Sequence, residues 1–392
     1  MNGFKFKLTF WKTILGALLL TGIYVTILRF IRGLGASTNL SDAFPWGLWI
    51  GFDVMCGVML AAGGFTLTAT VYIFNLKRFK PIVRPAVLTA FLGYVLVAVA
   101  LLYDLGRSYR IWHPIVLWNP RSVMFEVAWC VMLYLTVLAL EFAAAVFERL
   151  GMEKLLRIQH AITIPLVIAG VLLSTLHQSS LGSLYLIVPE KLHPYWYTPL
   201  LPLLFFVSAV CVGLAMTIFE SSMSARHFRK QLEMPLMMGL GRALLVGLIA
   251  YSVLRFHDLF HRGAWKLLAR GGDETWMFLL EVTLGLLLPI VLLLIPKVRE
   301  SSGGLYISSV LALFGFVANR MNVAITGMEA SAATHYFPKW TEWVITGCII
   351  GVGFAMFALA VKYLPVFAPE GVRLETAEAR EPALAVMSHA SP

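Results

Sequence analysis

Residues 159–180 read QHAITIPLVIAGVLLSTLHQSS. Its apolar part, residues 159–177, is long enough to cross a bilayer, because a transmembrane helix needs about 20 residues. The stretch becomes polar from His177 onward. Polar and titratable groups are costly inside a membrane, so they usually face the interior of a helix bundle and have a function. The stretch therefore predicts a membrane-spanning helix with a polar site at one end.

Apolar runs of similar length occur throughout the rest of the chain. Hydrophobic residues make up 59% of the 392 residues and charged residues only 13%, whereas soluble proteins contain about 25% charged residues. We expect an all-α integral membrane protein with about ten transmembrane helices. The predicted spans, numbered in chain order, are 13–31, 46–75, 85–103, 122–147, 159–177, 199–220, 240–258, 275–295, 304–325 and 340–364. Residues 365–392 are rich in Pro, Ala and Glu, which predicts a disordered tail.

Lysines and arginines in the loops predict the orientation. If the N-terminus is inside, the inside segments carry 18 Lys and Arg and the outside segments carry 12. The positive-inside rule therefore places both termini, including the tail, in the cytoplasm. The same loop residues account for most of the net charge of +10. This charge points to anionic lipid headgroups of the bilayer, and not to nucleic acid, as the partner of the basic surface.

The intramembrane charges and polar histidines gather toward the face that this orientation makes periplasmic. Their one-sided arrangement predicts a polar, proton-handling pocket and not a passive anchor. The residues on this face are Asp53, Asp104, Arg107, Glu126, His177, Arg255, Asp258, Glu281, Arg320 and Glu342.

His177 is the first candidate in this pocket. Imidazole titrates near neutral pH, and each ring nitrogen can donate or accept a hydrogen bond. These properties suit a residue that binds a quinone carbonyl and passes on its proton. Gln178 lies beside it, and Asp53 lies about two turns into the second span, where it needs a partner such as Arg255 or Arg320. The alternative for His177 is a helix-terminal histidine whose nitrogens bond to nearby hydroxyl groups.

Carboxyl groups at other depths predict a proton path across the membrane. Proton relays are built from spaced acids, hydroxyl groups and water. Glu126 lies near the outer face, Tyr94 in mid-membrane, and Glu141, Glu148 and Glu220 toward the inner face. The alternatives are a packing role for the tyrosine and a simple helix-end position for Glu148 and Glu220.

Four charged residues are expected to form structural ion pairs: Asp104, Arg107, Arg255 and Asp258. Arg107 follows Asp104 by three residues, so both share one helix face if the helix continues. Such a pair would close the outer end of the third span.

A weak internal repeat is visible in the spacing of the acids. Asp104 precedes Glu126 by 22 residues, and Asp258 precedes Glu281 by 23. Spans two to five, within 46–177, and spans six to nine, within 199–325, would then form two four-helix bundles in parallel orientation. The first and last spans would flank these bundles.

The cysteines and histidines do not indicate a metal centre. Each of the four cysteines lies alone in an apolar stretch and no CxxC pair occurs, so neither an iron–sulfur cluster nor a zinc site is expected in this chain. A b-type haem would need two histidines facing each other at similar depth. His160 and His177 lie at opposite ends of one span, and His257 and His261 could approach His177 only at the surface. No haem is therefore expected.

Several segments resemble the NrfD/PsrC-like family of quinone-interacting membrane subunits, and within it the HybB branch of respiratory nickel–iron hydrogenases. The matching stretches lie mainly between residues 44 and 220, with weaker similarity to residue 364. They are Phe44–Gly47, Phe52–Asp53, Arg84–Ala86, Asp104–Arg107, Phe125–Glu126, Ala139–Phe142, Phe147–Gly151, His177–Ser180 and Phe219–Glu220. Their combination is specific, whereas any one of them alone is not.

The resemblance implies a ten-helix protein of the bacterial inner membrane that binds menaquinone or ubiquinone toward the periplasmic side. It implies that haem is absent and that a ferredoxin-like iron–sulfur subunit docks on that side. In the hydrogenase branch it further implies the small and large Ni/Fe-hydrogenase subunits as partners. The family's functional positions correspond to Tyr94, Glu126, His177 and Glu220 in this chain.

The sequence therefore predicts the quinone-reactive membrane subunit of a periplasm-facing Ni/Fe-hydrogenase complex. It would pass electrons between an iron–sulfur partner and the quinone pool, coupled to proton transfer across the membrane, without reacting with hydrogen itself. One alternative is the membrane subunit of another NrfD-type reductase, for polysulfide or nitrite. A secondary transporter is another, because repeats and intramembrane acids are common there. A structural anchor whose acids merely pair is the third.

Overall fold

The computed structural model describes residues 10–187, 190–228, 231–332 and 334–367. Within these ranges the chain forms helices and loops and no strand. Ten segments are long and apolar enough to cross a membrane, which confirms the prediction of an all-α protein with ten transmembrane helices. Residues 368–392, nearly all of the tail predicted to be disordered, lie outside the described residues.

Seven of the ten spans contain one long α-helix. They are α1 (Phe10–Arg32), α5 (Val83–Asp104), α7 (Val123–Leu150), α8 (Glu153–Leu184), α9 (Leu201–His227), α10 (Met234–His261) and α16 (Trp340–Tyr363). The connections carry the short helices α2 (Leu34–Ser37), α6 (His113–Val116) and α13 (Pro296–Arg299), and the 3₁₀ turns η3 (Lys77–Ile82), η4 (Ser108–Arg110) and η5 (Ala264–Arg270).

The other three spans are interrupted by π-helical turns. The second span consists of η1 (Trp49–Cys56), α3 (Gly57–Leu60), α4 (Gly63–Thr68) and η2 (Ala69–Ile73). The eighth consists of α11 (Asp273–Val282), η6 (Thr283–Leu287) and α12 (Leu288–Leu294), and the ninth of α14 (Ser302–Met321), η7 (Asn322–Thr326) and α15 (Gly327–Ala332). Such π-turns often mark functional positions, and three of them lie at buried charged residues: η1 contains Asp53, η6 begins two residues after Glu281, and η7 begins two residues after Arg320.

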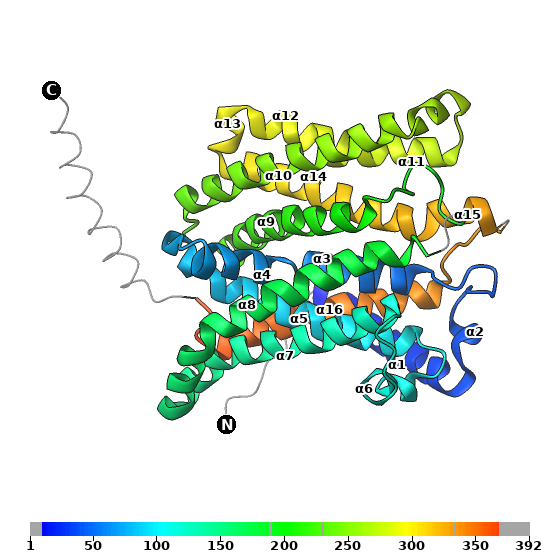
Figure 1. Ribbon diagram of the computed structural model, residues 1–392. Helices are drawn as coiled ribbons and strands as arrows, with labels where there is room; N and C mark the ends of the chain where they lie inside the picture. The colour runs from blue at the N-terminus through cyan, green and yellow to red at the C-terminus, as the bar shows by residue number, and fades with distance from the viewer. Residues whose placement is uncertain (1–9, 188–189, 229–230, 333, 368–392) are drawn as a thin grey trace, which may run out of the picture.

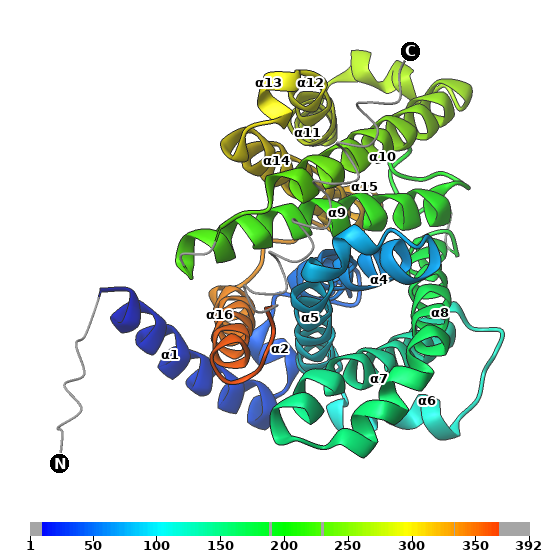
Figure 2. The same cartoon turned by 90° about the vertical axis from the view of Figure 1, so that its left-hand side faces the viewer.

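The helices run roughly parallel and contact one another in two sets (Figure 1). In the first set α5 packs on α4 and α7, and α7 packs along α8. In the second set α9 packs on α10 and α14, and α14 packs on η6 and α12. Contacts of α9 with α8 and α4 join the two sets. Figure 2 shows α1 and α16 together on the flank beside α5, which α16 contacts.

Glycines bring helices of the second set unusually close together. A side chain added at Gly285 of η6 would collide with the backbone of Gly315 in α14. Small residues allow such close approach in membrane helices, where packing and not water exclusion drives association. The pair fixes η6 against α14, next to the buried carboxylate of Glu281.

The fifth span extends beyond its predicted end. The sequence predicts that it ends at His177, but α8 continues to Leu184. The serines do not stop the helix, because their hydroxyl groups donate to carbonyls within it: Ser180 Oγ donates to the carbonyl of Leu176 at 2.9 Å, and Ser183 Oγ to that of Ser179 at 3.3 Å. His177 therefore lies inside a helix, about two turns from its end.

Candidate functional site

His177 and Tyr94 form a hydrogen bond in the interior of the first set. Tyr94 lies in α5 and His177 in α8, and both are fully buried. The other ring nitrogen of His177, Nδ1, lies 2.7 Å from the carbonyl oxygen of Leu173. Because a carbonyl oxygen can only accept, Nδ1 carries the proton in the neutral imidazole and Nε2 is the acceptor. The Tyr94 hydroxyl group therefore donates to His177 Nε2.

Three further polar side chains of the first set lie around this pair. The Tyr134 ring stands edge-on to Tyr94, with ring centroids 4.8 Å apart, and its centroid lies 5.6 Å from that of His177. Gln178 Nε2 donates to the carbonyl of Val58 at 3.0 Å. Ser174 lies one helical turn before Gln178 and is fully buried. We call Tyr94, Tyr134, Ser174, His177 and Gln178 the His177 site.

Three polar atoms of the His177 site make no hydrogen bond of good geometry among the described residues, although their side chains approach one another or the Tyr94 hydroxyl group. They are Tyr134 Oη, Ser174 Oγ and Gln178 Oε1. Most buried polar atoms in proteins are hydrogen bonded, so each exception needs an explanation. The two hydroxyl groups can donate to a carbonyl oxygen and the amide oxygen can accept from a hydroxyl group. This donor set fits a quinone or the corresponding quinol.

Asp53 lies apart from the His177 site in its hydrogen bonding. It is buried in η1, and its Oδ2 accepts a hydrogen bond of 2.7 Å from Thr346 of α16. The prediction that Asp53 pairs with an arginine was wrong, because the hydroxyl group of Thr346 in the last span binds its carboxylate instead. In the described part of the chain no hydrogen bond joins Asp53 to His177.

Glu220 of α9 is hydrogen bonded to the third span at Thr89, which precedes Tyr94 in α5. Its Oε2 accepts a hydrogen bond of 2.7 Å from Thr89, while its Oε1 is buried without a partner among the described residues. Thr89 precedes Tyr94 by five residues of α5, about 7.5 Å along the helix axis. Glu220 of α9 thus contacts α5 at Thr89, which lies more than one helical turn from Tyr94 and on a different face of α5.

The three acids of α7 lie at very different depths. Glu126 is in the first turn of α7 and half-buried, and Glu141 lies about four turns further along. Glu148 is near the other end and forms an exposed ion pair of 2.7 Å with Arg84. The 22 residues from Glu126 to Glu148 correspond to about 33 Å of helix. The acids therefore span the membrane, but Glu148 sits at the surface.

Arg255 and Asp258, both expected in structural ion pairs, each form an ion pair with a different residue. Arg255 pairs with Glu281, at 3.8 Å, and not with Asp258. Asp258 Oδ2 accepts a hydrogen bond of 2.8 Å from Nε of Arg262, one turn later, and lies 2.7 Å from its Nη2. Arg255 thus reaches across to α11, whereas Asp258 pairs within the end of its own helix, α10.

Asp104 is not paired with Arg107 in the described residues. The residue beside it is Arg29 of α1, whose Nε and Nη2 donate to the carbonyl oxygens of Tyr103 and Leu105 at 2.7 and 2.8 Å. Arg29 is buried, so α1 supplies the neighbouring positive charge. The helix ends at Asp104, which removes the shared helix face on which the predicted pair depended.

A buried polar network in the second set was not foreseen from the sequence. Glu281 Oε1 accepts from Asn319 at 2.8 Å, and Oε2 accepts from Trp196 and Asn322 at 2.9 Å each. Asn319 Oδ1 in turn accepts from Arg320 at 3.3 Å. We call these five residues, together with Arg255, the Glu281 network. Three polar residues within four positions of an apolar span, Asn319 to Asn322, were the signal for it.

Arg320 is held within the Glu281 network and against α9. Its Nη2 donates to Ser208 Oγ at 2.8 Å and to the carbonyl of Phe205 at 3.1 Å. Its guanidinium carbon lies 3.3 Å from the centroid of the Phe205 ring, a cation–π contact. Arg320 therefore serves as a structural contact between α14 and α9 and not as the partner of Asp53.

Glu342 ties together the loops at the end of the protein where η1 begins. The Tyr336 hydroxyl donates to Glu342 and accepts from the backbone N–H of Leu48, while Asn39 N and Lys339 N donate to the same carboxylate at 2.9 and 3.0 Å. Burial, and secondarily the hydrogen bond to Glu342, raise the pKa of Tyr336 above its ordinary value. Tyr336 is thus a proton donor at neutral pH, and the group stabilises the fold.

Residues 36–332 match the family model described as "Polysulphide reductase, NrfD". The chain belongs to this NrfD family. A Nitratidesulfovibrio vulgaris protein is 40% identical over 375 residues, 93% of this chain and 96% of the relative. The "Probable Ni/Fe-hydrogenase 2 b-type cytochrome subunit" of Escherichia coli is 34% identical, covering 91% and 92%. The "Menaquinone reductase, integral membrane subunit" of N. vulgaris is 28% identical, covering 93% of both chains.

The name of the E. coli relative raises the question of a b-type haem, which His177, His257 and His261 of this NrfD-family chain do not fit. Both ring nitrogens of His177 already have partners, Tyr94 and the Leu173 carbonyl. His257 and His261 lie one turn apart on the same helix, with stacked rings 6.2 Å apart, and so cannot face each other across a haem. Among the described residues no group of three His, Cys, Asp or Glu could hold a metal ion.

Proposed function

We propose that this chain is the quinone-reactive membrane subunit of a Ni/Fe-hydrogenase complex. The observation that carries the proposal is the His177 site, where a proton-donating Tyr94–His177 pair adjoins three buried polar atoms that make no hydrogen bond of good geometry among the described residues. Two relatives add support, since one is named as a Ni/Fe-hydrogenase 2 subunit and the other as a menaquinone reductase subunit. Menaquinone or ubiquinone would be the ligand.

The residues of the His177 site would orient the quinone and supply protons to it. A bound quinone exchanges electrons and protons at its carbonyl oxygens. The hydroxyl groups of Tyr134 and Ser174 can donate to one carbonyl oxygen, and Gln178 Oε1 can accept from a quinol hydroxyl group. His177 can give up the proton on its Nδ1 while its Nε2 takes the proton of the Tyr94 hydroxyl group, which the proton route then replaces. The carboxyl group of Asp53, in the neighbouring η1, would influence the electrostatic environment of the bound quinone.

Protons would reach the site along the first set. Glu148 would take them up at the surface, Glu141 and Glu220 would carry them inward, and Thr89 and Tyr94 would deliver them to His177. This order follows the depths of the side chains along α7, α5 and α9. Glu126, at the opposite end of α7, would exchange protons on the other side.

Electrons would come from outside this chain. The partner would be a ferredoxin-like iron–sulfur subunit bound on the periplasmic side, which in turn contacts the small and large hydrogenase subunits. The loop charges support an orientation in the bacterial inner membrane with both termini in the cytoplasm. In that orientation the end of α8 that carries His177 faces the partner.

Replacing Tyr94 with Phe tests the proposal directly. The variant keeps the ring but removes the donor to His177, and we expect quinone turnover by the assembled complex to fall by about 10-fold, equivalent to ~1.4 kcal/mol. Hydrogen-to-dye activity of the partner should stay unchanged. Tyr195→Phe is the matched control, because it removes a similarly buried hydroxyl group, bonded to Thr275 of α11, from the connection between α8 and α9. Equal quinone turnover in the Tyr94 and Tyr195 variants would refute the assignment.

Replacing Glu220 with Gln tests the proton route. We expect proton uptake coupled to quinone reduction in liposomes to fall by at least ~10-fold, because the amide cannot carry a proton between Thr89 and the inner surface. Glu153→Gln, an exposed acid at the start of α8, is the control and should leave proton uptake unchanged. Normal proton uptake by the Glu220 variant, measured with a pH dye inside the vesicles, would exclude Glu220 from the route.

A further inference from the structure

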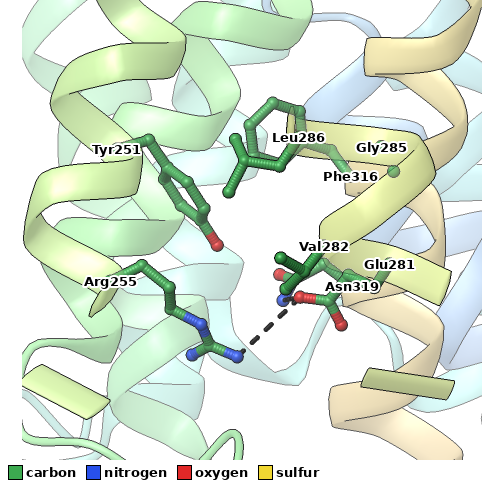
Figure 3. Close-up of a pocket in the computed structure, with 9 residues that line it drawn as sticks. Tyr251, Arg255, Glu281, Val282, Gly285, Leu286, Phe316 and Asn319 are labelled. Carbon is green, nitrogen blue, oxygen red and sulfur yellow. Dashed lines mark hydrogen bonds and ion pairs between the residues drawn. The ribbon is translucent and has the colours of Figure 1, made fainter. Parts of the chain in front are cut away.

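The second set contains a small cavity beside the Glu281 network. It lies between α10, the α11–η6 segment and α14, and its volume is about 10 Å³. Figure 3 shows the Tyr251 hydroxyl group and the Arg255 guanidinium group pointing into it from α10, with Glu281 and Asn319 on the opposite side. The remaining lining is apolar. Polar groups of α10 therefore face polar groups of α11 and α14 across the cavity without a hydrogen bond between them.

Arg255 is buried here without adequate partners. It is 1% exposed, yet its Nε and Nη2 make no hydrogen bond to any of the described residues. Its nearest carboxylate oxygen, Glu281 Oε1, lies 3.8 Å from Nη2. This separation is too long for a hydrogen bond, and polar contacts beyond about 3.5 Å are commonly bridged by water. A guanidinium group buried at this depth without hydrogen-bond partners would destabilise the folded protein by several kcal/mol.

The size and charge of the cavity decide which ligand fits. A quinone is far too large, because about 10–15 Å³ holds one water molecule. An apolar ligand would leave the Arg255 N–H groups unsatisfied. A monatomic anion would be repelled by the Glu281 carboxylate, which lines the same cavity. We propose that one water molecule binds in this cavity and bridges Arg255 to Glu281, with the Tyr251 hydroxyl group as a further partner.

The bridging water forms a contact between α10 and α11, beside η6, that can follow small movements of these helices. Glu281 already accepts three hydrogen bonds on its two oxygens, so its position is fixed by Trp196, Asn319 and Asn322. Arg255, in contrast, is held to the network only across the cavity. Because water both donates and accepts, it keeps Arg255 and Tyr251 hydrogen bonded if α10 shifts against α11. The site is separate from the His177 site and does not depend on quinone binding.

A structure of the full chain in its native complex, at a resolution that shows ordered water, tests the proposal. We expect density within about 3.2 Å of Arg255 Nε or Nη2, in both chloride and bromide buffers. A cavity without density, with the Arg255 N–H groups bonded to protein atoms, would overturn the proposal. An anomalous bromide signal in the cavity would overturn it too, in favour of an anion.

Radiolytic hydroxyl labelling provides an independent readout in solution. Bound water generates the radicals locally, so Tyr251 should be labelled several-fold more than Tyr195, which is equally buried but bonded to Thr275. Val282→Ile adds a methyl group to the cavity wall and should reduce Tyr251 labelling to the Tyr195 level. Val291→Ile, an exposed residue of α12, is the matched control. Equal labelling of Tyr251 and Tyr195 in the wild type would argue against a bound water.

Discussion

Replacing His177 with Ala is expected to lower quinone turnover of the assembled complex by about 100-fold or more. Positioned proton donors of this kind contribute roughly 10²- to 10⁴-fold. The variant removes the imidazole that accepts from Tyr94 and donates to the Leu173 carbonyl. It also removes the ring nitrogen to which the Tyr94 hydroxyl group donates. The measurement is hydrogen-dependent reduction of a soluble quinone analogue by the purified complex.

The matched control for this variant is His160→Ala. His160 lies on the same helix, α8, but is exposed, so its removal should change neither turnover nor assembly. Hydrogen-to-dye activity separates the membrane subunit from its partners and should be normal in both variants. If quinone turnover of an assembled His177 variant equals that of the wild type, His177 has no part in quinone chemistry. The chain would then act as an anchor.

Replacing Glu281 with Ala is expected to cause the largest loss of stability, about 3–5 kcal/mol. The carboxylate is 5% exposed and accepts hydrogen bonds from Trp196, Asn319 and Asn322. Its removal leaves three buried donors unsatisfied and Arg255 without a counter-charge. We expect a Tm lower by several degrees and a reduced yield of folded protein. Thermal unfolding of the purified protein followed by tryptophan fluorescence measures this effect.

Two variants control for this result. Glu300→Ala removes an exposed acid next to α13 and should leave Tm within a degree or so of the wild type, since surface substitutions usually change stability by under about 0.5 kcal/mol. Glu281→Gln keeps the shape but places an amide N–H against donors, so it should be destabilised nearly as much as the Ala variant. A Glu281→Ala protein with wild-type Tm would show that the network carries no net stability.

The hydrophobic runs were sufficient to predict the ten spans. Hydropathy acts locally, residue by residue, so the spans could be read from the sequence and are confirmed. Their ends were less certain, as α8 shows, because Ser180 and Ser183 can bond to carbonyls within the helix and prolong it. The π-turns were not predicted, since no local pattern distinguishes them from an α-helix.

Residue types alone also indicated which side chains are unusual in a membrane. His177, Gln178, Asp53 and Glu281 were singled out because a polar group in hydrocarbon is costly. All four are buried inside the protein. What each of them binds could not be read in the same way.

The pairing of these groups was decided by tertiary structure. Tyr94 meets His177 across 83 positions of sequence, and Asp53 meets Thr346 across 293. Arg255 contacts Glu281 and not the nearby Asp258. The sequence by itself determined that the chain crosses the membrane ten times and where its polar groups lie along each helix. Helix rotation and tilt, which set the partners, come from packing between distant segments, and only the folded protein reveals them.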